Sequence, residues 1–519
     1  MTTAPRAGLK ACTTDGAFGR ILTKVVQAFR PAVGSAFRPA VGSTFTPAVV
    51  VALVAVSACA PKTKYVTPTV DVAPAFRENA DWKVAAPGDE VLRGTWWELF
   101  GDPELNALEQ QIDVSNQTLK AAAARFAQAR ALVRGTRAGL FPTVDFVPSA
   151  SRGEASGNRP SSTFHQAAND FVLPVDVSYE VDVWGRIHSA VNASRAEAQA
   201  SAADLETARL SLHAELASDY FTLRGIDRDR QLLEAAVESF QKALELTQNR
   251  FQGGIASQAD VAQAETVLET TRAQAVDVAV ARAAVEHAIA VLVGKPASAF
   301  SISVAPLRAA PPSVPAGLPS ELLERRPDIA AAERRVAAAN AQLGVATAAF
   351  YPRLLLSGSA GFESSPLGSL LSGTSSFWSI GPALLVNVFD GGRRRAVSDQ
   401  ARAAQDEATA VYRQAVLIAF REVEDQLAAL RILEEEAGIQ RRAVDAAERS
   451  LMQATNRYRG GLASYLEVTV AQSVALNNQR TAVGILTRQM NASVLLMKGL
   501  GGGWRLATLP TSSNPDSRE

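Results

Sequence analysis

Cysteine, histidine and methionine are scarce: the chain of 519 residues has two, four and four of them. With only Cys12 and Cys59, no disulfide framework can hold a small secreted fold together, and no Cys/His cluster can ligate a structural metal. The methionines are not arranged as a relay of soft metal ligands either. Burial of apolar side chains must therefore stabilise the fold.

Signs of enzyme chemistry are missing as well. The four histidines follow no metal-ligand spacing, and no Gly-x-Ser-x-Gly motif occurs. The segment Val293–Pro296 looks faintly like a phosphate loop, but Ile289 stands where that motif needs glycine, and a proline follows the lysine. It predicts a helix end. We expect no catalytic centre, no metal site and no cofactor.

Charge of one sign is confined to the start of the chain. Lys and Arg equal Asp and Glu overall, but residues 1–58 hold six basic residues against Asp15 alone. The remainder, with a net charge of −5, gives no support for nucleic-acid binding, which needs a clustered basic face.

Residues 47–58 form a short apolar run behind that basic segment and end in small residues, which is typical of a secretory signal and too short to span a bilayer. The leader is longer than usual and contains AFRPAVGS twice, which suggests a start codon placed too far upstream or a slipped duplication. The tetrad Val56–Cys59 resembles a bacterial lipobox, in which Cys59 would be lipidated. A signal with a chance cysteine is the alternative.

An internal repeat follows, with an offset of 207 residues: RFQGGIAS at 250–257 matches RYRGGLAS at 457–464. The same offset aligns Gly185-Arg186 with Gly392-Arg393 and Asp260-Val261 with Glu467-Val468. About 80 residues thus pass without an insertion. Such unbroken register indicates a continuous helix followed by a turn.

The helical period is sustained before each turn. Apolar residues recur at spacings of three, four and seven from Leu205 to Phe251, and only Gln440 breaks the equivalent stripe of the second copy. No proline lies between Pro174 and Pro296. A helix over 186–250 would measure roughly 98 Å at 1.5 Å per residue. The segments 258–293 and 465–498 must run back antiparallel beside these rods.

Upstream of each rod the period changes to two, which predicts strands with one apolar and one polar face over 143–151, 171–183, 353–362 and 378–388. Their length suits a tilted strand crossing a bilayer. Four strands cannot close a barrel, because small barrels need about eight, but a symmetric oligomer can supply the rest. The alternative is an antiparallel coiled-coil scaffold with a small soluble sheet.

These residues resemble the TolC-like outer-membrane factors of tripartite export systems, in the lipoprotein branch that serves resistance-nodulation-division pumps. The motifs that carry the resemblance are the lipobox at Cys59, WWELFGDPEL at 96–105, EVDVWGR at 180–186, FDGGR at 389–393 and the two Arg-aromatic-x-Gly-Gly turns. The resemblance covers residues 59 to 500.

The resemblance implies a mainly α fold with a transmembrane β-barrel, built as a trimeric α/β barrel duct. Each protomer would contribute four strands and long antiparallel helices in two structural repeats, giving 12 strands. The implied parts are a leader (1–58), a lipidated N-terminal segment and equatorial part (59–102), the first repeat (103–300), an equatorial linker (301–320), the second repeat (321–500) and a disordered tail (501–519). A helix over 104–140 would climb to the membrane.

The implied function is that of an outer-membrane channel of a tripartite efflux pump: a passive exit duct for small molecules, opened at its periplasmic tip by an adaptor. Its partners would be two further copies of the chain, a periplasmic adaptor, an inner-membrane pump of the resistance-nodulation-division type and outer-membrane lipids, with no nucleic acid. The alternatives are the exit duct of a type I protein secretion system and a soluble periplasmic scaffold or adaptor.

The site residues are carried over from the same resemblance. Asp260 and Glu467 would ring the closed aperture, with Tyr458 and Arg457 as gate partners, although Val470 stands where related ducts often have a second acid. Adaptor docking would fall on Gly253, Gly254, Ile255, Ala256, Ser257, Gly460, Gly461, Leu462, Ala463 and Ser464. Candidates for the barrel lumen are Asp145, Asp176, Glu180, Asp182 and Arg353.

Overall fold

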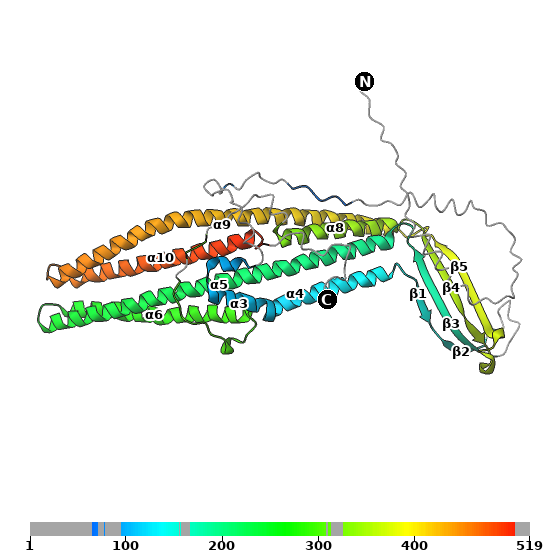
Figure 1. Ribbon diagram of the computed structural model, residues 1–519, viewed down its shortest axis with the longest axis horizontal. Coiled ribbons are helices and arrows are strands. Elements are labelled where there is room, and N and C mark those ends of the chain that lie inside the picture. Colours follow the sequence, from blue (N-terminus) through cyan, green and yellow to red (C-terminus); the bar gives the residue numbers. More distant parts are fainter. Residues whose placement is uncertain are drawn as a thin grey trace, which may run out of the picture. The chain divides into compact units, whose positions relative to one another are not determined.

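The computed structural model describes residues 65–70, 77, 95–154, 156, 167–307, 310–312 and 325–503. The leader, Cys59 and the tail beyond residue 503 lie outside the described residues. The elements, in order, are η4 (Trp96–Phe100), α3 (Pro103–Ser115), α4 (Gln117–Ala138), β1 (Thr143–Phe146), β2 (Ser149–Gly153), β3 (Ala168–Val181), α5 (Arg186–Gln252), α6 (Gln258–Leu292), η5 (Ala297–Ala299), α8 (Pro327–Ala348), β4 (Arg353–Ser364), η7 (Leu367–Ser369), η8 (Gly373–Ser375), β5 (Ser376–Leu385), α9 (Arg393–Arg459) and α10 (Tyr465–Gly499) (Figure 1).

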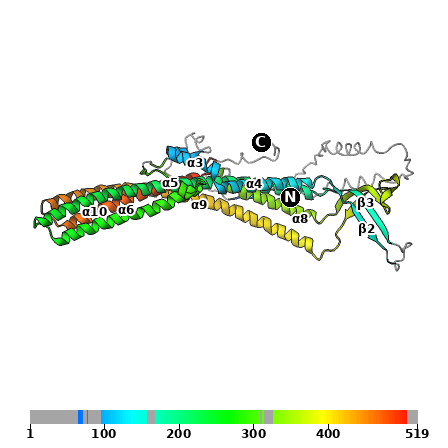
Figure 2. The same cartoon turned by 90° about the horizontal axis from the view of Figure 1, so that it is seen from below.

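The two rods are uninterrupted, as the sequence predicts. The helices α5 and α9 have 67 residues each, which corresponds to about 100 Å, and each is followed by an antiparallel helix of 35 residues, α6 or α10. At the end that carries the two turns, the hairpins α5–α6 and α9–α10 lie side by side in both views (Figures 1 and 2). None of the described helices contains a stretch that is long and apolar enough to cross a membrane.

Each rod begins on an aspartate that the preceding segment supplies. The carboxylate of Asp182 accepts the backbone N–H groups of Ile187 and His188 at 3.0 and 2.8 Å. In the second copy Asp390 accepts from Gly392 and Arg394 at 3.1 and 3.3 Å. The first N–H groups of a helix have no partner within it, so a carboxylate there is stabilising.

The strands form one antiparallel sheet in the order β1-β3-β4-β5, with β2 also paired to β3. The prediction of a continuous strand over 143–151 was wrong, because Val147 and Pro148 separate β1 from β2. Proline has no N–H to donate to the ladder. Since β1 and β2 lie in line along β3, through Thr143↔Ser178 and Ser149↔Val172, the sheet still has four strand positions.

The predicted helix over 104–140 is broken at Asn116. Its backbone is extended (φ −62°, ψ 125°), and its side-chain oxygen accepts the N–H of Leu119 at 2.9 Å and so caps α4. The Asn116 amide also donates to the carbonyl of Leu292, at the end of α6, at 2.7 Å. Asparagine competes with the helix for backbone partners in this way, which explains the break.

Along its length α5 changes partners. Its first third faces α8 through the ion pair Arg335–Asp204, and further along it meets α6 through Arg282–Asp227 and α10 through Arg480–Asp229. Around the middle of the rods, Trp96, Trp97 and Phe100 of η4 are buried in the largest apolar cluster. A second cluster, with Phe240, Leu268, Tyr458 and Tyr465, fills the end near the turns.

A buried carboxylate fixes the segment that leaves α6. Asp227 has a fully buried side chain and accepts from Arg282 at 2.8 Å, from Arg224 at 3.3 Å and from the N–H of Ala305 at 3.1 Å. Arg282 also donates to the carbonyl of Ile302 at 2.8 Å. Removing one partner of such a network leaves a buried charge uncompensated, so these groups hold the described part of the equatorial linker against both helices.

The helices α10 and α5 pack closely at Gly225. A Cβ atom there would lie 2.2 Å from the hydroxyl oxygen of Thr487, whereas a Cβ at Gly484 of α10 would meet nothing within 4 Å. Next to this crossing, Asn491 donates to the hydroxyl of Thr222 at 3.1 Å. The missing side chain of Gly225 therefore lets the two hairpins pack directly.

We expect Gly225→Ala and Gly484→Ala to have opposite effects on stability. Alanine in an open helix position stabilises by about 0.5–1 kcal/mol, so Gly484→Ala should raise the midpoint of thermal unfolding. At Gly225 the overpacking penalty of about 1–3 kcal/mol should outweigh that gain. Thermal unfolding in detergent measures both, and equal midpoints for the two variants would refute the close crossing.

Candidate functional site at the helical tip

The two Gly-Gly turns have the same closure. Gly254 and Gly461 lie in the left-handed region, with φ of 74° and 72°, which glycine adopts without steric cost. The N–H of Ile255 donates to the carbonyl of Arg250, and that of Leu462 to the carbonyl of Arg457, both at 2.8 Å. This six-residue closure is the Schellman motif that ends helices.

Both turns place an apolar side chain in solvent: Ile255 is 70% exposed and Leu462 75% exposed. They lie among the residues that the resemblance assigns to adaptor docking. An apolar side chain on a rigid turn loses little conformational freedom when it is covered, which favours binding.

The two acidic residues of the turns, Asp260 and Glu467, have different partners. Asp260 forms a capping box: its carboxylate accepts from the N–H of Ser257 at 2.9 Å, and the Ser257 hydroxyl accepts from the N–H of Asp260 at 3.1 Å. In the second copy Ser464 makes no such bond, and Glu467 pairs with Arg457 at 3.6 Å on an exposed surface.

Arg250 joins the two hairpins. Its guanidinium donates to the carbonyls of Tyr458 and Arg459 at 3.0 and 3.2 Å, and its central carbon lies 4.6 Å from the centre of the Tyr458 ring. A cation at the carbonyl end of a helix is favourable, and so is a guanidinium over an aromatic face. We name this contact between Arg250 and the end of α9 the Arg250 clasp.

Tyr458 belongs to the core of the tip. It is 5% exposed, whereas Phe251, its counterpart in the first copy, is 45% exposed. Its hydroxyl donates to the hydroxyl of Thr247 at 3.3 Å, and its ring meets that of Tyr465 edge-on at 5.3 Å. Burial raises the pKa of Tyr465 to about 12, so the Tyr465 hydroxyl keeps its proton at neutral pH.

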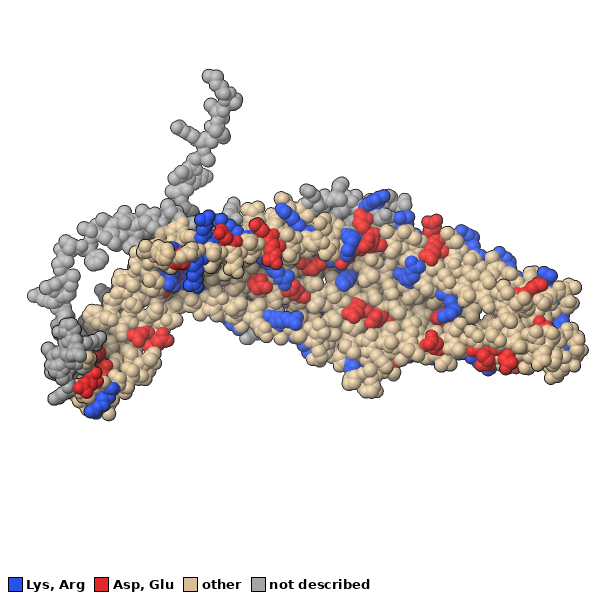
Figure 3. Space-filling view, turned by 180° about the vertical axis from the view of Figure 1, so that it is seen from behind, with Lys and Arg blue, Asp and Glu red and all other residues tan. Residues whose placement is uncertain are grey.

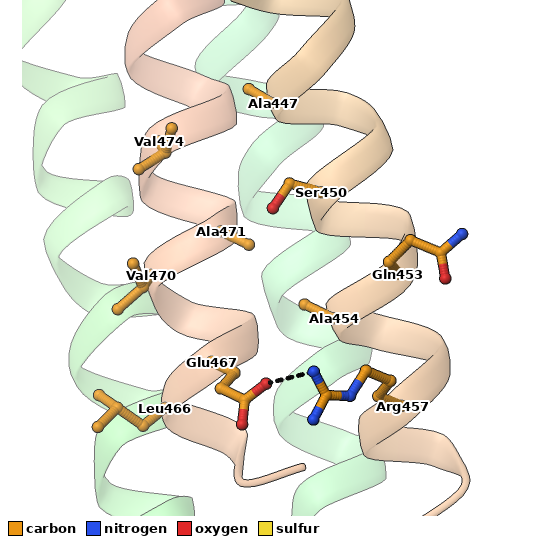
Figure 4. Close-up of a pocket in the computed structure, with 10 residues that line it drawn as sticks. All are labelled: Ala447, Ser450, Gln453, Ala454, Arg457, Leu466, Glu467, Val470, Ala471 and Val474. Carbon is orange, nitrogen blue, oxygen red and sulfur yellow. Dashed lines mark ion pairs between the residues drawn. The ribbon is translucent and has the colours of Figure 1, made fainter. Parts of the chain in front are cut away.

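A groove of about 500 Å³ opens between α9 and α10 just above the second turn (Figure 4). Leu466, Val470 and Val474 of α10 line one side of it, and Ala447, Ser450, Gln453 and Ala454 of α9 the other. The Arg457–Glu467 ion pair bridges its lower end (Figure 4). An apolar floor with an exposed ion pair at the end suits an apolar partner that carries a few charges.

The lumen candidates do not act as one group. Asp145 lies opposite Asp176 across β1 and β3, whereas Glu180 holds Arg186 at 2.8 Å and Asp182 caps α5. Arg353 begins β4 opposite Leu385. On the face shown in Figure 3, acidic and basic side chains are interspersed over the helices, so no field of one sign gathers there.

Long antiparallel hairpins that end in paired turns, joined to strands of bilayer length, define the protomer of a membrane export channel. The chain matches the family model described as outer membrane efflux protein over residues 108–295 and 318–502. It belongs to this family.

The similar proteins agree in class. The solvent efflux pump outer membrane protein SrpC of Pseudomonas putida is 33% identical over 411 residues, 79% of this chain and 87% of that protein. The pyoverdine export outer membrane protein OpmQ of Pseudomonas aeruginosa is 32% identical, over 82% of this chain and 91% of that protein. Among solved structures, the outer-membrane channel OprN matches with a TM-score of 0.80 at 32% identity, over 86% of this chain and 100% of that one. The open state of the MtrE channel of Neisseria gonorrhoeae matches with a TM-score of 0.77 at 28% identity, over 86% and 99%.

The different capping of the two turns gives a matched pair of variants. Ser257→Ala removes a capping bond and should cost about 1 kcal/mol, whereas Ser464→Ala removes no such bond and should cost much less. Thermal unfolding of the two variants measures the difference. Equal losses would show that the capping box at Ser257 does not stabilise α6.

Proposed function

We propose that three copies of this chain form the exit duct of a tripartite efflux pump, and that the helical tip is the part that opens. Its place in the outer membrane and its role in efflux follow from the family. Three protomers with four strand positions each would give 12 strands, enough to close a barrel. In this duct, residues 103–300 and 321–500 would form the two repeats, and Cys59 would carry the lipid anchor.

The observation that carries the proposal is the Arg250 clasp. It connects the first hairpin to the end of α9 at the tip, and higher up Arg480 of α10 holds Asp229 of α5 with two bonds of 2.8 and 2.9 Å. Since such bidentate pairs are the stronger kind of ion pair, the upper connection should persist while the clasp breaks. The hairpin α9–α10 would then swing outward.

Partners of the duct would act at the same place. An adaptor that fills the groove between α9 and α10 would reach Leu462 and compete with the Arg457–Glu467 pair, while the exposed Ile255 offers a second contact on the other hairpin. We propose that this adaptor serves an inner-membrane pump of the resistance-nodulation-division type. SrpC and OpmQ are named for solvent and pyoverdine export, which supports small molecules as cargo. The chain itself would act passively, without a catalytic centre.

Breaking the clasp should open the duct. Arg250→Met keeps the length of the side chain but removes the charge and its donors, so we expect a several-fold increase in single-channel conductance in planar bilayers. Arg230→Met is the control, because Arg230 lies on the same helix and pairs with Glu234 of that helix at 2.8 Å. If Arg250→Met conducts like the wild type, the clasp is not part of the gate.

The proposed acidic ring has a separate test. Asp260→Ala combined with Glu467→Ala should raise conductance and reduce cation preference, since six carboxylates around an axis attract cations. Ser257→Ala serves as the control, because it disrupts the same capping box without removing a charge. An unchanged cation preference in the double variant would remove both acids from the aperture.

A further inference from the structure

A buried acid–base pair lies between α3 and α5, away from the tip and from the strands. The Nδ1 atom of His213 lies 2.6 Å from a carboxylate oxygen of Glu109, and the two side chains are 4% and 0% exposed. The second carboxylate oxygen of Glu109 has no hydrogen-bond partner among the described residues. The imidazole stacks on Trp97 of η4 at 4.4 Å and 20°. Neither group takes part in the proposed channel function.

Charged side chains reach the pair from the two helices that carry it, α3 and α5. Asp113 of α3 lies 3.7 Å from His213 and is held by Arg209 of α5 at 2.9 Å, and Arg209 also binds Glu206. Trp97 of η4, which stacks on the imidazole, belongs to an apolar cluster that also includes Leu119 of α4, Ile289 of α6 and Met490 of α10. A full charge on either member of the pair is therefore poorly solvated.

We propose that Glu109 and His213 together hold one proton at neutral pH, and that this proton docks α3 onto α5, so that alkaline surroundings loosen the docking. A distance of 2.6 Å between a carboxylate oxygen and a ring nitrogen requires a proton between them, because two unprotonated acceptors repel. The number of bound protons is the same in a neutral pair, with the proton on Glu109, and in an ion pair, with the proton on His213.

The pKa shifts agree with this arrangement. Burial, reinforced by Asp113, raises the pKa of Glu109 well above 4.5. Burial lowers the pKa of His213 from 6.5 to about 4, with Asp113 and Arg209 acting in opposite directions. Between the ordinary pKa values of 4.5 and 6.5, the undocked state also carries one proton on the two groups, so docking is independent of pH there.

Above pH 6.5 the undocked state loses its proton from histidine, while the docked pair keeps its own. Docking then takes up one proton, and stability falls as the pH rises until the raised pKa of Glu109 is reached. The constant for local opening of α3 should increase about tenfold per pH unit in this range. Below 4.5 the undocked state binds a second proton, and docking weakens again.

Hydrogen exchange of α3 amides in the intact protein in detergent tests the proposal, with rates corrected for their intrinsic pH dependence. We expect the opening constant to stay level from about pH 5 to 6.5 and to rise about tenfold per unit above it. Glu109→Gln replaces the titrating acid by a neutral group of the same shape and should abolish the alkaline rise. Glu238→Gln, a fully exposed acid of α5, is the control and should keep it.

A second variant keeps the proposal testable if Glu109→Gln does not fold. In His213→Gln the remaining Glu109 should still hold its proton, so the rise should begin near pH 4.5, the ordinary pKa of the acid, instead of 6.5. A wild-type opening constant that stays level above pH 6.5 would overturn the proposal, and so would an alkaline rise that survives in Glu109→Gln. Because exchange at α3 is measured, neither result depends on the conductance of the duct.

Discussion

A helix of 67 residues must bury its apolar stripe at every level, and this requirement organises the rest of the fold. No single partner is long enough, because α6 and α10 have 35 residues and α8 has 22. The stripe of α5 is therefore covered in turn by α8 and α4, by α3 with η4, and by the hairpin partners α6 and α10. An ion pair joins α5 to its partner at each of these levels: Asp204–Arg335, Glu109–His213, then Asp227 with its two arginines.

These ion pairs fix the register of α5 against its partner helices, which apolar contacts alone would allow to shift along the helix axis. Buried ion pairs are weak evidence for stability, but breaking one leaves a charge without compensation. A shift of α6 by one turn would separate Arg282 from both Asp227 and the carbonyl of Ile302. Gln440, which interrupts the apolar stripe of α9, acts in the same sense, since it donates to the carbonyl and side chain of Asn478 on α10.

Periodicity predicted the rods, the returning helices and the strand positions, because each of these depends on many residues that agree. The breaks were missed because each depends on one residue. Asn116 ends a helix through two side-chain bonds, one of them to a residue 176 positions away, and Pro148 interrupts a strand whose alternation looks regular. The Arg250 clasp could not be predicted either, since both copies of the repeat carry arginine at that place and only the packing selects one.

Because Arg250 and not Arg457 forms the clasp, the two turns are unequal although their backbones close in the same way. The carbonyls at the end of α9 receive Arg250 from the other hairpin, and Arg457, its counterpart, turns to Glu467 beside the groove. Because Tyr458 is buried under the same arginine, the end of α9 cannot leave the tip without exposing an aromatic ring and an unpaired cation. Separation at the first turn would expose less new apolar surface, since Phe251 is already 45% exposed. Of the two turns, the second therefore contributes more to holding the hairpins together at the tip, and it is the turn beside the groove between α9 and α10.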